Sequence, residues 1–348
     1  MKEEKEILAG KTLQDLQEIA KKRGWPKFTA RQIAEWVYQK NAASFDDMTN
    51  ISKKIRKELE AGFEIGVTPH LKVNTSSDGT KKYLYPYGAL KFIETAYIPE
   101  EKRNTLCVSS QIGCKMGCLF CMTGKQGFQG NLTAGQIVNQ VLSLPERENL
   151  TNIVYMGMGE PFDNLKEVLK SIEIFTADWG LAMSPKRITV STIGVIPAMK
   201  TFIEQSDAHL AISLHSPFED ERRKLMPIES VYSLGELIQT LHDYDFGRQR
   251  RVSFEYIMFK GLNDQKKHVK QITRLLHGLR ARVNLIRFHP IPGTPLEGTD
   301  DATIEWFRDE LNSKGVKTTI RASRGQDIEA ACGLLSTKEQ VKMQSPDF

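Results

Sequence analysis

Six short β-rich apolar runs recur after residue 100 and alternate with helical patterns. They are NTLCVSS (104–110), TNIVYMG (151–157), RITVSTIG (187–194), HLAISLH (209–215), VSFEYIMF (252–259) and VNLIRFHP (283–290). Amphipathic patterns typical of helices lie between them, for example over 165–175 and 269–279. Strands that alternate with helices pair in parallel, because each connection crosses back over the sheet. The sequence therefore predicts an α/β fold, a partial (β/α)6 barrel of the TIM type over 101–348.

A helical segment precedes the predicted barrel. Apolar residues recur at helical spacing over 12–24, Thr29 is the expected N-cap of a second helix, and a third helix is expected over 52–59. We expect 1–70 to form a small N-terminal helical accessory domain. The first 60 residues carry 13 Lys/Arg against 10 Asp/Glu, which is +3 of the net charge of +5. This charge is compatible with a solvated surface and with a surface that contacts a polyanion.

The segment between this domain and the barrel has the pattern of paired strands. The period of apolar residues changes after residue 70, and Asp78-Gly79 is a typical hairpin turn. We expect 71–100 to be a β-hairpin linker region.

Composition limits the class of protein. A chain of 348 residues with 40% apolar content can bury a full core. The first ten residues carry charges, and no stretch approaches the roughly 18 apolar residues of a membrane helix, so we expect a cytoplasmic protein that binds no membrane. We also expect a monomer. In a reducing cytosol, clustered cysteines are metal ligands or catalytic thiols more often than disulfides.

Polar residues follow the ends of the predicted strands. They are MGMGEP (156–161), Ser191-Thr192, Ser213-Leu214-His215, Glu255 and His289. In β/α barrels the chemistry takes place at the ends of strands, so a shared position there indicates an active site. A lone histidine such as His215 is more often a structural residue, but several polar residues at one end of a barrel favour function.

Three of the five cysteines, Cys114, Cys118 and Cys121, form a C-x3-C-x2-C motif just after the first predicted barrel strand. A zinc site would need a fourth ligand, and the nearest later histidine is His209. Three thiolates suit an iron–sulfur cluster with one open iron, which can bind a substrate or cofactor. The alternative is a zinc knuckle that takes a distant ligand, as in a metal-stapled RNA-binding module.

With Phe120 before its last cysteine, this motif resembles the signature of the radical S-adenosylmethionine (SAM) enzymes. The series CVSSQIGCKMGCLFCMTGKQGF, MGMGEPFDN, STIGVIPAMK, ISLHSP, NLIRFHPIPG and DIEAACGLL, in that order, resembles the RlmN/Cfr family of RNA adenine methyltransferases. The resemblance covers about residues 90–335. It implies a barrel of the radical SAM type, one [4Fe-4S] cluster on Cys114, Cys118 and Cys121, and two SAM molecules per turnover.

The resemblance also implies a SAM pocket. Gly159 and Glu160 would meet the amino group of SAM, because a glycine permits close approach and a carboxylate pairs with an ammonium. Ser191 and Ser213-Leu214-His215 would line the rest of the pocket. His289 stands where the family has an asparagine, and a histidine can donate a similar hydrogen bond.

Cys107 and Cys332 lie outside the motif, and either cysteine alone would be taken for a small buried apolar residue. The resemblance instead implies that Cys332 accepts a methyl group from SAM and joins covalently to the RNA base. It implies that Glu94 is the proton acceptor, with Cys107 as the alternative. It further implies that Cys107 resolves the adduct and ends in a disulfide with Cys332.

The implied substrates are RNA. They are carbon 2 of adenosine 2503 in 23S rRNA and of adenosine 37 in tRNA, with an external electron donor such as flavodoxin. The related alternative is a Cfr-type enzyme that methylates carbon 8 of the same rRNA adenine; Pro161 and PIPGTP (290–295) favour the C2 enzyme. Basic clusters at 221–224, 247–251 and 321–324 are by themselves typical of solvated surface.

Overall fold

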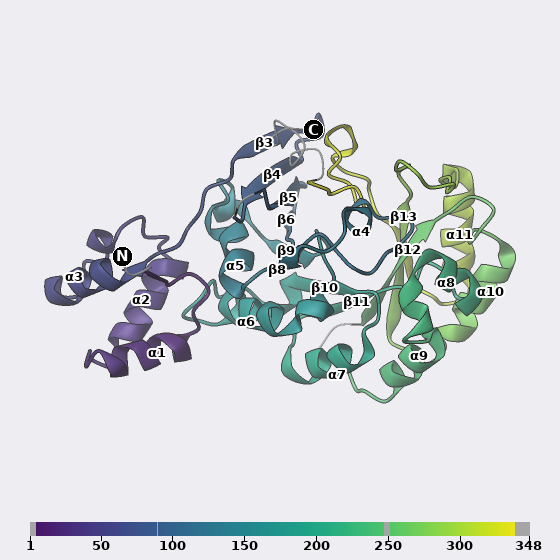
Figure 1. The fold of residues 1–348 in the computed structure, drawn as a ribbon. Helices are drawn as coiled ribbons and strands as arrows, with labels where there is room; N and C mark the ends of the chain where they lie inside the picture. The colour runs from purple at the N-terminus through teal and green to yellow at the C-terminus, as the bar shows by residue number, and fades with distance from the viewer. Residues whose placement is uncertain (1–4, 89, 247–250, 338–348) are drawn as a thin grey trace.

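The partial barrel is one end of a ten-stranded sheet (Figure 1). The computed structural model describes residues 5–88, 90–246 and 251–337. Seven neighbouring strands are parallel: β6 (Asn104–Cys107), β9 (Asn152–Tyr155), β10 (Ile188–Thr192), β11 (His209–Ser213), β12 (Val252–Met258), β13 (Ala281–Arg287) and β14 (Thr318–Ile320). The first six are the strands predicted from sequence, and β14 adds a seventh beside β13.

Helices connect the parallel strands and cover the outer face of the sheet (Figure 1). They are α5 (Ala134–Leu142), α6 (Leu165–Thr176), α7 (Ile196–Gln205), α8 (Glu219–Leu225), α9 (Leu234–His242), α10 (Lys266–Leu275) and α11 (Asp301–Ser313). The short helix α4 (Met122–Gln126) instead follows Cys121 directly and lies beside the cysteine motif. A short antiparallel pair, β7 (Gln111–Ile112) and β8 (Gly130–Asn131), brackets the cysteine motif. The alternation of strand and helix brings the carboxyl ends of the strands to one end of the barrel.

The segment 71–100 continues the barrel sheet. Its strands β3 (Lys72–Thr75), β4 (Lys81–Pro86) and β5 (Phe92–Pro99) are antiparallel, and β5 pairs with β6. The turn between β3 and β4 contains Asp78 and Gly79, whose φ of +85° suits a glycine. We call β3–β5 the antiparallel extension.

The N-terminal region contains α1 (Leu13–Lys22), α2 (Thr29–Tyr38) and α3 (Lys53–Gly62), with a short parallel pair, β1 (Glu6–Ile7) and β2 (Phe63–Glu64). Thr12 caps α1 through a reciprocal capping box with Asp15. The prediction that Thr29 caps α2 is wrong: Phe28 is the N-cap residue, and its side chain makes no capping hydrogen bond. Thr29 is buried in the first turn, where packing outweighs its capping preference.

The N-terminal helices pack on the barrel through α5 and α6 (Figure 1). Buried apolar residues of both regions form one continuous cluster. Gly10 and Gly135 lie so close that a Cβ on Gly10 would be 2.3 Å from the Gly135 nitrogen. Among the described residues, no helix is long and apolar enough to cross a membrane.

Candidate active site

A cavity lies at the carboxyl ends of the parallel strands, where the sequence predicted chemistry. The predicted residues that line it are Cys114, Cys118, Cys121, Gly159, Glu160, Ser191, Ser213, His215 and Cys332. We call it the first cavity. It brings together residues from five strand ends and from the C-terminal segment.

The cysteine motif forms a loop that is anchored on three sides. The Cys114 nitrogen donates to the Gly127 carbonyl (3.2 Å), and the Leu119 nitrogen donates to the Leu225 carbonyl (3.0 Å). Cys121 is the N-cap of α4. Phe120, the aromatic residue of the motif, is buried with its ring 4.7 Å from that of His215. The loop therefore holds the three thiols at the mouth of the barrel.

The three thiols fit a four-iron cluster better than a single ion. Burial, followed by the nearness of Cys121 and Cys114, raises the pKa of Cys118 well above its usual range. A bound cationic centre would remove the energetic cost of deprotonating these buried thiols, because the positive charge of the centre and the negative charges of its thiolate ligands neutralise each other. In the described part of the chain, no three His, Cys, Asp or Glu side chains are grouped for one metal ion. The thiolates of a four-iron cluster each bind a different iron, so they lie farther apart than the ligands of one ion.

Glu160 is held rigidly at the wall of the first cavity. Its carboxylate accepts hydrogen bonds from the Thr192 hydroxyl (2.6 Å), the Ile193 nitrogen (3.1 Å) and the Phe162 nitrogen (3.1 Å). Burial nevertheless raises the pKa of Glu160 to about 7. A buried carboxylate without a cation can bind an ammonium group strongly.

Gly159 permits the turn that presents this carboxylate. Its φ is +98°, and a Cβ there would lie 2.5 Å from the Cβ of Gln111. A side chain is excluded at this position both by the backbone conformation and by the close packing.

His215 is neutral and has a fixed orientation. Burial lowers its pKa to about 3, and its Nδ1 accepts a hydrogen bond from the Ile257 nitrogen (3.0 Å). The proton of the neutral ring is therefore on Nε2, which can donate. His215 has a φ of +54°, an uncommon conformation for a residue with a side chain.

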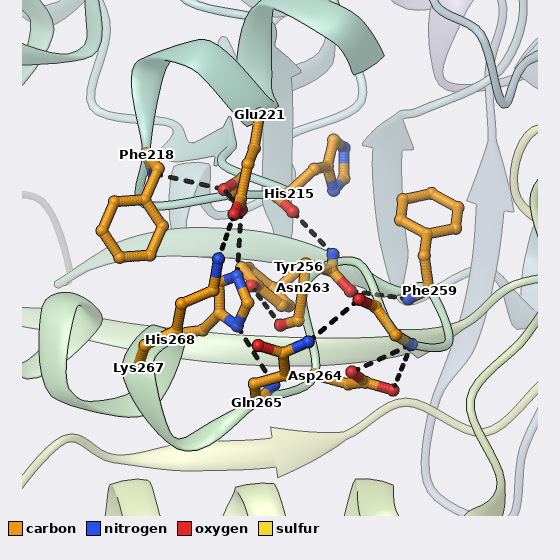
Figure 2. Close-up of polar contacts among 12 residues, drawn as sticks. His215, Phe218, Glu221, Tyr256, Phe259, Asn263, Asp264, Gln265, Lys267 and His268 are labelled. Atoms are coloured by element: carbon orange, nitrogen blue, oxygen red, sulfur yellow. Dashed lines mark hydrogen bonds and ion pairs between the residues drawn. The ribbon is translucent and has the colours of Figure 1, made fainter.

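Figure 2 shows the polar network that holds His215 in this conformation. The Asn263 side-chain amide donates to the carbonyls of His215 and Ile257 (both 2.7 Å), and its oxygen accepts from the Phe259 nitrogen (2.7 Å). On the other side of the turn, Glu221 accepts from the Ser216 hydroxyl (2.7 Å). Asn263 is fully buried, so each of its polar atoms depends on these partners.

A second cavity meets the first inside the barrel. It is lined by Cys107, His289 and four arginines, Arg103, Arg282, Arg321 and Arg324. Cys332 lines both cavities, as do Arg321 and Glu255, which form an ion pair (3.2 Å). Cys332 therefore lies at the boundary between the two cavities.

Both isolated cysteines are free thiols, so the expected disulfide between Cys107 and Cys332 is not formed. Burial and the nearness of Cys332 raise the pKa of Cys107 to about 12, which keeps it protonated. The structure therefore does not support the disulfide that the resemblance implies between Cys107 and Cys332 at the end of the reaction.

Besides Cys107, three predicted site residues lie outside the first cavity. Glu94 is buried on β5, where it pairs with Lys82 (3.1 Å) and accepts from the Ser336 nitrogen (3.0 Å). Leu214 is fully buried, and its nitrogen donates to the Glu255 carbonyl (2.9 Å). His289 lines the second cavity, where its Nε2 lies 3.0 Å from the Ser323 hydroxyl.

Sequence reasoning did not assign Asn263, Arg321 or Lys82 to the site. Arg321 belongs to a basic cluster that was expected on the surface, but its guanidinium points between the cavities toward Glu255. Most of the cluster at 247–251 lies outside the described residues. Asn263 belongs to none of the motifs noted in the sequence. An asparagine in a turn directly after a strand often hydrogen-bonds to nearby backbone groups, so its position was the available signal.

Comparison with known proteins agrees with this geometry. Residues 108–272 match the model of the radical SAM superfamily, and residues 7–65 match that of the ribosomal RNA large subunit methyltransferase N-terminal domain. The chain is 38% identical to a crystal structure of a radical SAM methyltransferase from Sphaerobacter thermophilus, with a TM-score of 0.89 over 96% of this chain and 100% of that chain. The fold and the cysteine loop thus define a radical SAM enzyme.

Two curated relatives narrow the class. A protein of Bacteroides thetaiotaomicron named "Probable dual-specificity RNA methyltransferase RlmN" is 57% identical over 96% of both chains. The dual-specificity RNA methyltransferase RlmN of a Nitratiruptor species is 45% identical over 90% of this chain and 94% of the relative. The chain belongs to the RlmN family of radical SAM RNA methyltransferases.

Proposed function

We propose that this protein methylates carbon 2 of adenosine 2503 in 23S rRNA and of adenosine 37 in tRNA. The observation that carries the proposal is the position of Cys332, which lines both cavities. A sulfur at this boundary can take a methyl group from a cofactor on one side and deliver it to a base on the other. Because rRNA and tRNA are cytoplasmic substrates, we infer a cytoplasmic enzyme.

Cys114, Cys118 and Cys121 would hold the [4Fe-4S] cluster, with SAM beside it in the first cavity. When bound, the cluster supplies the electron that cleaves SAM and starts radical chemistry. Glu160 would bind the amino group of SAM, with Ser191, Ser213 and His215 along the wall. Leu214 would contribute its backbone only, and His289 would act from the second cavity. The electron comes from an external donor such as flavodoxin, and we expect a monomer.

Cys332 would act twice. As a thiolate it accepts the methyl group of one SAM, and S-adenosylhomocysteine leaves. The sulfur-bound methyl group would then lose one hydrogen atom to the radical that a second SAM gives on reductive cleavage. The resulting carbon radical would add to carbon 2 of adenine, which is too electron-poor to attack a methyl group itself. The sulfur then links the protein to the RNA through that carbon.

Glu94 and Cys107 would complete the reaction. Burial raises the pKa of Glu94 although Lys82 lowers it, and this favours a carboxyl group that can receive the carbon-2 proton. Cys107 lines the second cavity with Cys332 and would attack its sulfur as a thiolate. An S–S bond would form as the bond between the Cys332 sulfur and the transferred carbon breaks, and that carbon would take up a proton to become the methyl group of the released base. The arginines of the second cavity suit an RNA strand, whose target base must be unstacked to enter.

The two isolated cysteines provide the test. Cys332→Ala should give no methylated RNA and no protein–RNA bond, because the accepting sulfur is absent. Cys107→Ala should accumulate covalently attached RNA, because the adduct forms but is not released. Denaturing gels of each variant made in cells, with and without nuclease, would show the difference.

The outcome that contradicts these roles is normal turnover by Cys107→Ala or attached RNA on Cys332→Ala. Mass spectrometry of the product nucleosides separates the C2 reaction from the Cfr-type alternative. The proposal predicts 2-methyladenosine, whereas 8-methyladenosine would overturn it.

A further inference from the structure

Residues 325–337, the Cys332 segment, lie against the antiparallel extension (Figure 1, yellow beside β4). At the start of the segment, the Gly325 nitrogen donates to the Asp78 carboxylate (2.9 Å). Asp327 accepts from the Ser76 hydroxyl (2.5 Å) and the Ser77 nitrogen (3.0 Å). The turn between β3 and β4 therefore binds the first part of the segment.

These contacts are made by ionised carboxylates. Burial alone would raise the pKa of Asp78, but hydrogen bonds from Gly325 and Thr80 lower it to about 2. The hydrogen bond from Ser76 is the main reason that the pKa of Asp327 is lowered. Charged acceptors make stronger hydrogen bonds than neutral ones, so this attachment persists across the physiological pH range.

Lys82 lies under the middle of the segment. Its Nζ is 3.1 Å from Glu94 Oε1, and both side chains are buried, with exposed fractions of 7% and 2%. The same ammonium donates to the Glu329 carbonyl (3.4 Å). Glu329 has a φ of +53°, a left-handed conformation that is unfavourable for a residue with a side chain. Lys82 thus stabilises an unfavourable backbone conformation three residues before Cys332.

The far end of the segment is attached on two sides. The Ser336 nitrogen donates to Glu94 Oε2 (3.0 Å), on the extension. The Met122 nitrogen donates to the Gly333 carbonyl (2.8 Å), directly after the cluster ligand Cys121. Cys332 is therefore held between the extension and the cysteine loop.

We propose that Lys82 is a positioning residue for Cys332 and that the antiparallel extension is the support that keeps this sulfur at the boundary of the two cavities. The inference rests on the proposed role of Cys332 as methyl acceptor. Methyl transfer requires the sulfur in line with the methyl group, and a displacement of about 1 Å can cost about 100-fold in rate. The segment has no regular element besides the short helix Gln326–Ile328, so its own backbone hydrogen bonds do not fix Cys332 and such a support is needed.

Two substitutions test the support at separate places. Lys82→Met removes the ammonium but keeps an unbranched side chain of similar shape, and Asp327→Ala removes an exposed acceptor without disturbing the core. Asp301→Ala is the matched control, because Asp301 is also exposed and ion-paired (Arg287, 2.7 Å) but lies away from the segment. If Lys82→Met does not fold, Asp327→Ala still decides.

Two measurements are made on each variant. Hydrogen exchange of the amides of 325–337 in cluster-free protein should be faster by about tenfold or more in Lys82→Met and Asp327→Ala. Mass spectrometry of cluster-loaded protein given SAM should show methyl loading of Cys332 slowed by about tenfold or more, with SAM affinity unchanged. Asp301→Ala should match the wild type in both.

If both variants show wild-type exchange and wild-type methyl loading, the proposal that the antiparallel extension supports Cys332 is wrong. Faster exchange with unchanged loading would also overturn it, since the segment would then be held for stability alone. If wild-type protein never carries a methyl group on Cys332, the proposed function fails instead, and the exchange rates alone then decide whether the extension holds the segment.

Discussion

At the residue scale, the buried carboxyl group of Glu160, in the wall of the first cavity, makes the stability of the protein depend on pH. Its pKa in the folded protein is about 7, against 4.5 for an ordinary glutamate, because burial disfavours the charge. The folded state keeps this proton between pH 4.5 and 7 whereas the unfolded chain has lost it. Stability therefore falls as pH rises through that window, by about 3 kcal/mol in total.

Glu160→Gln should remove this pH dependence. We expect the free energy of unfolding of cluster-free wild type to fall by about 3 kcal/mol more than that of the variant between pH 4.5 and 8. The slopes of the two stability profiles against pH are compared, and not the absolute stabilities. In the variant the glutamine NH2 group would face the Ile193 nitrogen, which is also a donor, and this lowers stability at every pH. Urea unfolding across the pH range measures the stability of the wild type and of the variant. Glu305→Gln, which changes an exposed glutamate, is the control. Parallel profiles of variant and wild type would contradict the account.

At the scale of elements, the connection between β12 and α10 supports the turn after β11. Asn263 supplies the hydrogen bonds that join these elements (Figure 2). The turn carries His215 into the first cavity, so a residue outside the cavity controls the shape of its wall.

Asn263→Ala should destabilise the protein by about 3 kcal/mol or more, because two carbonyls and one nitrogen would be buried without partners at about 1–3 kcal/mol each. SAM affinity of the cluster-loaded variant should fall as well, since His215 would leave its left-handed conformation. Urea unfolding and equilibrium dialysis measure the two effects. Lys266→Ala, an exposed change on α10, should alter neither; equal stability of the two variants would show that the network is dispensable.

At the scale of the whole molecule, the N-terminal region is a part of the folded body as well as a carrier of positive charge. Its buried residues share the core cluster of the barrel, and Arg31 pairs with Asp178 (2.9 Å). Deleting the region would expose apolar surface of α5. The role of its charge is therefore better tested by substitution than by deletion.

If the N-terminal region contacts RNA, its exposed lysines should contribute to the salt dependence of binding. We expect Lys53→Glu, Lys54→Glu and Lys57→Glu together, on α3, to weaken RNA affinity and to flatten its dependence on salt. Lys270→Glu, Lys314→Glu and Lys317→Glu together are the control of equal charge on the barrel. Filter binding over a salt series measures the slope, and an equal slope for both triple variants would exclude a special role for the region.

The sequence by itself determined the features that depend on neighbouring residues. Six parallel strands were predictable because each is a short apolar run whose alternation with helices repeats along the chain. The grouping of Cys114, Cys118 and Cys121 at one cavity was predictable because the three residues lie within one short loop. The turn at Asp78-Gly79 was predictable because two adjacent residues define it.

Only the tertiary structure decided which distant residues meet. Arg321 and Lys82 look like surface charges in the sequence, and each is paired with a glutamate on another strand. The pairing of the antiparallel extension with the barrel, and the position of Cys332 between two cavities, likewise depend on contacts far apart in the chain. Periodicity is a local property, whereas the burial of a charge depends on the partner that the fold brings to it.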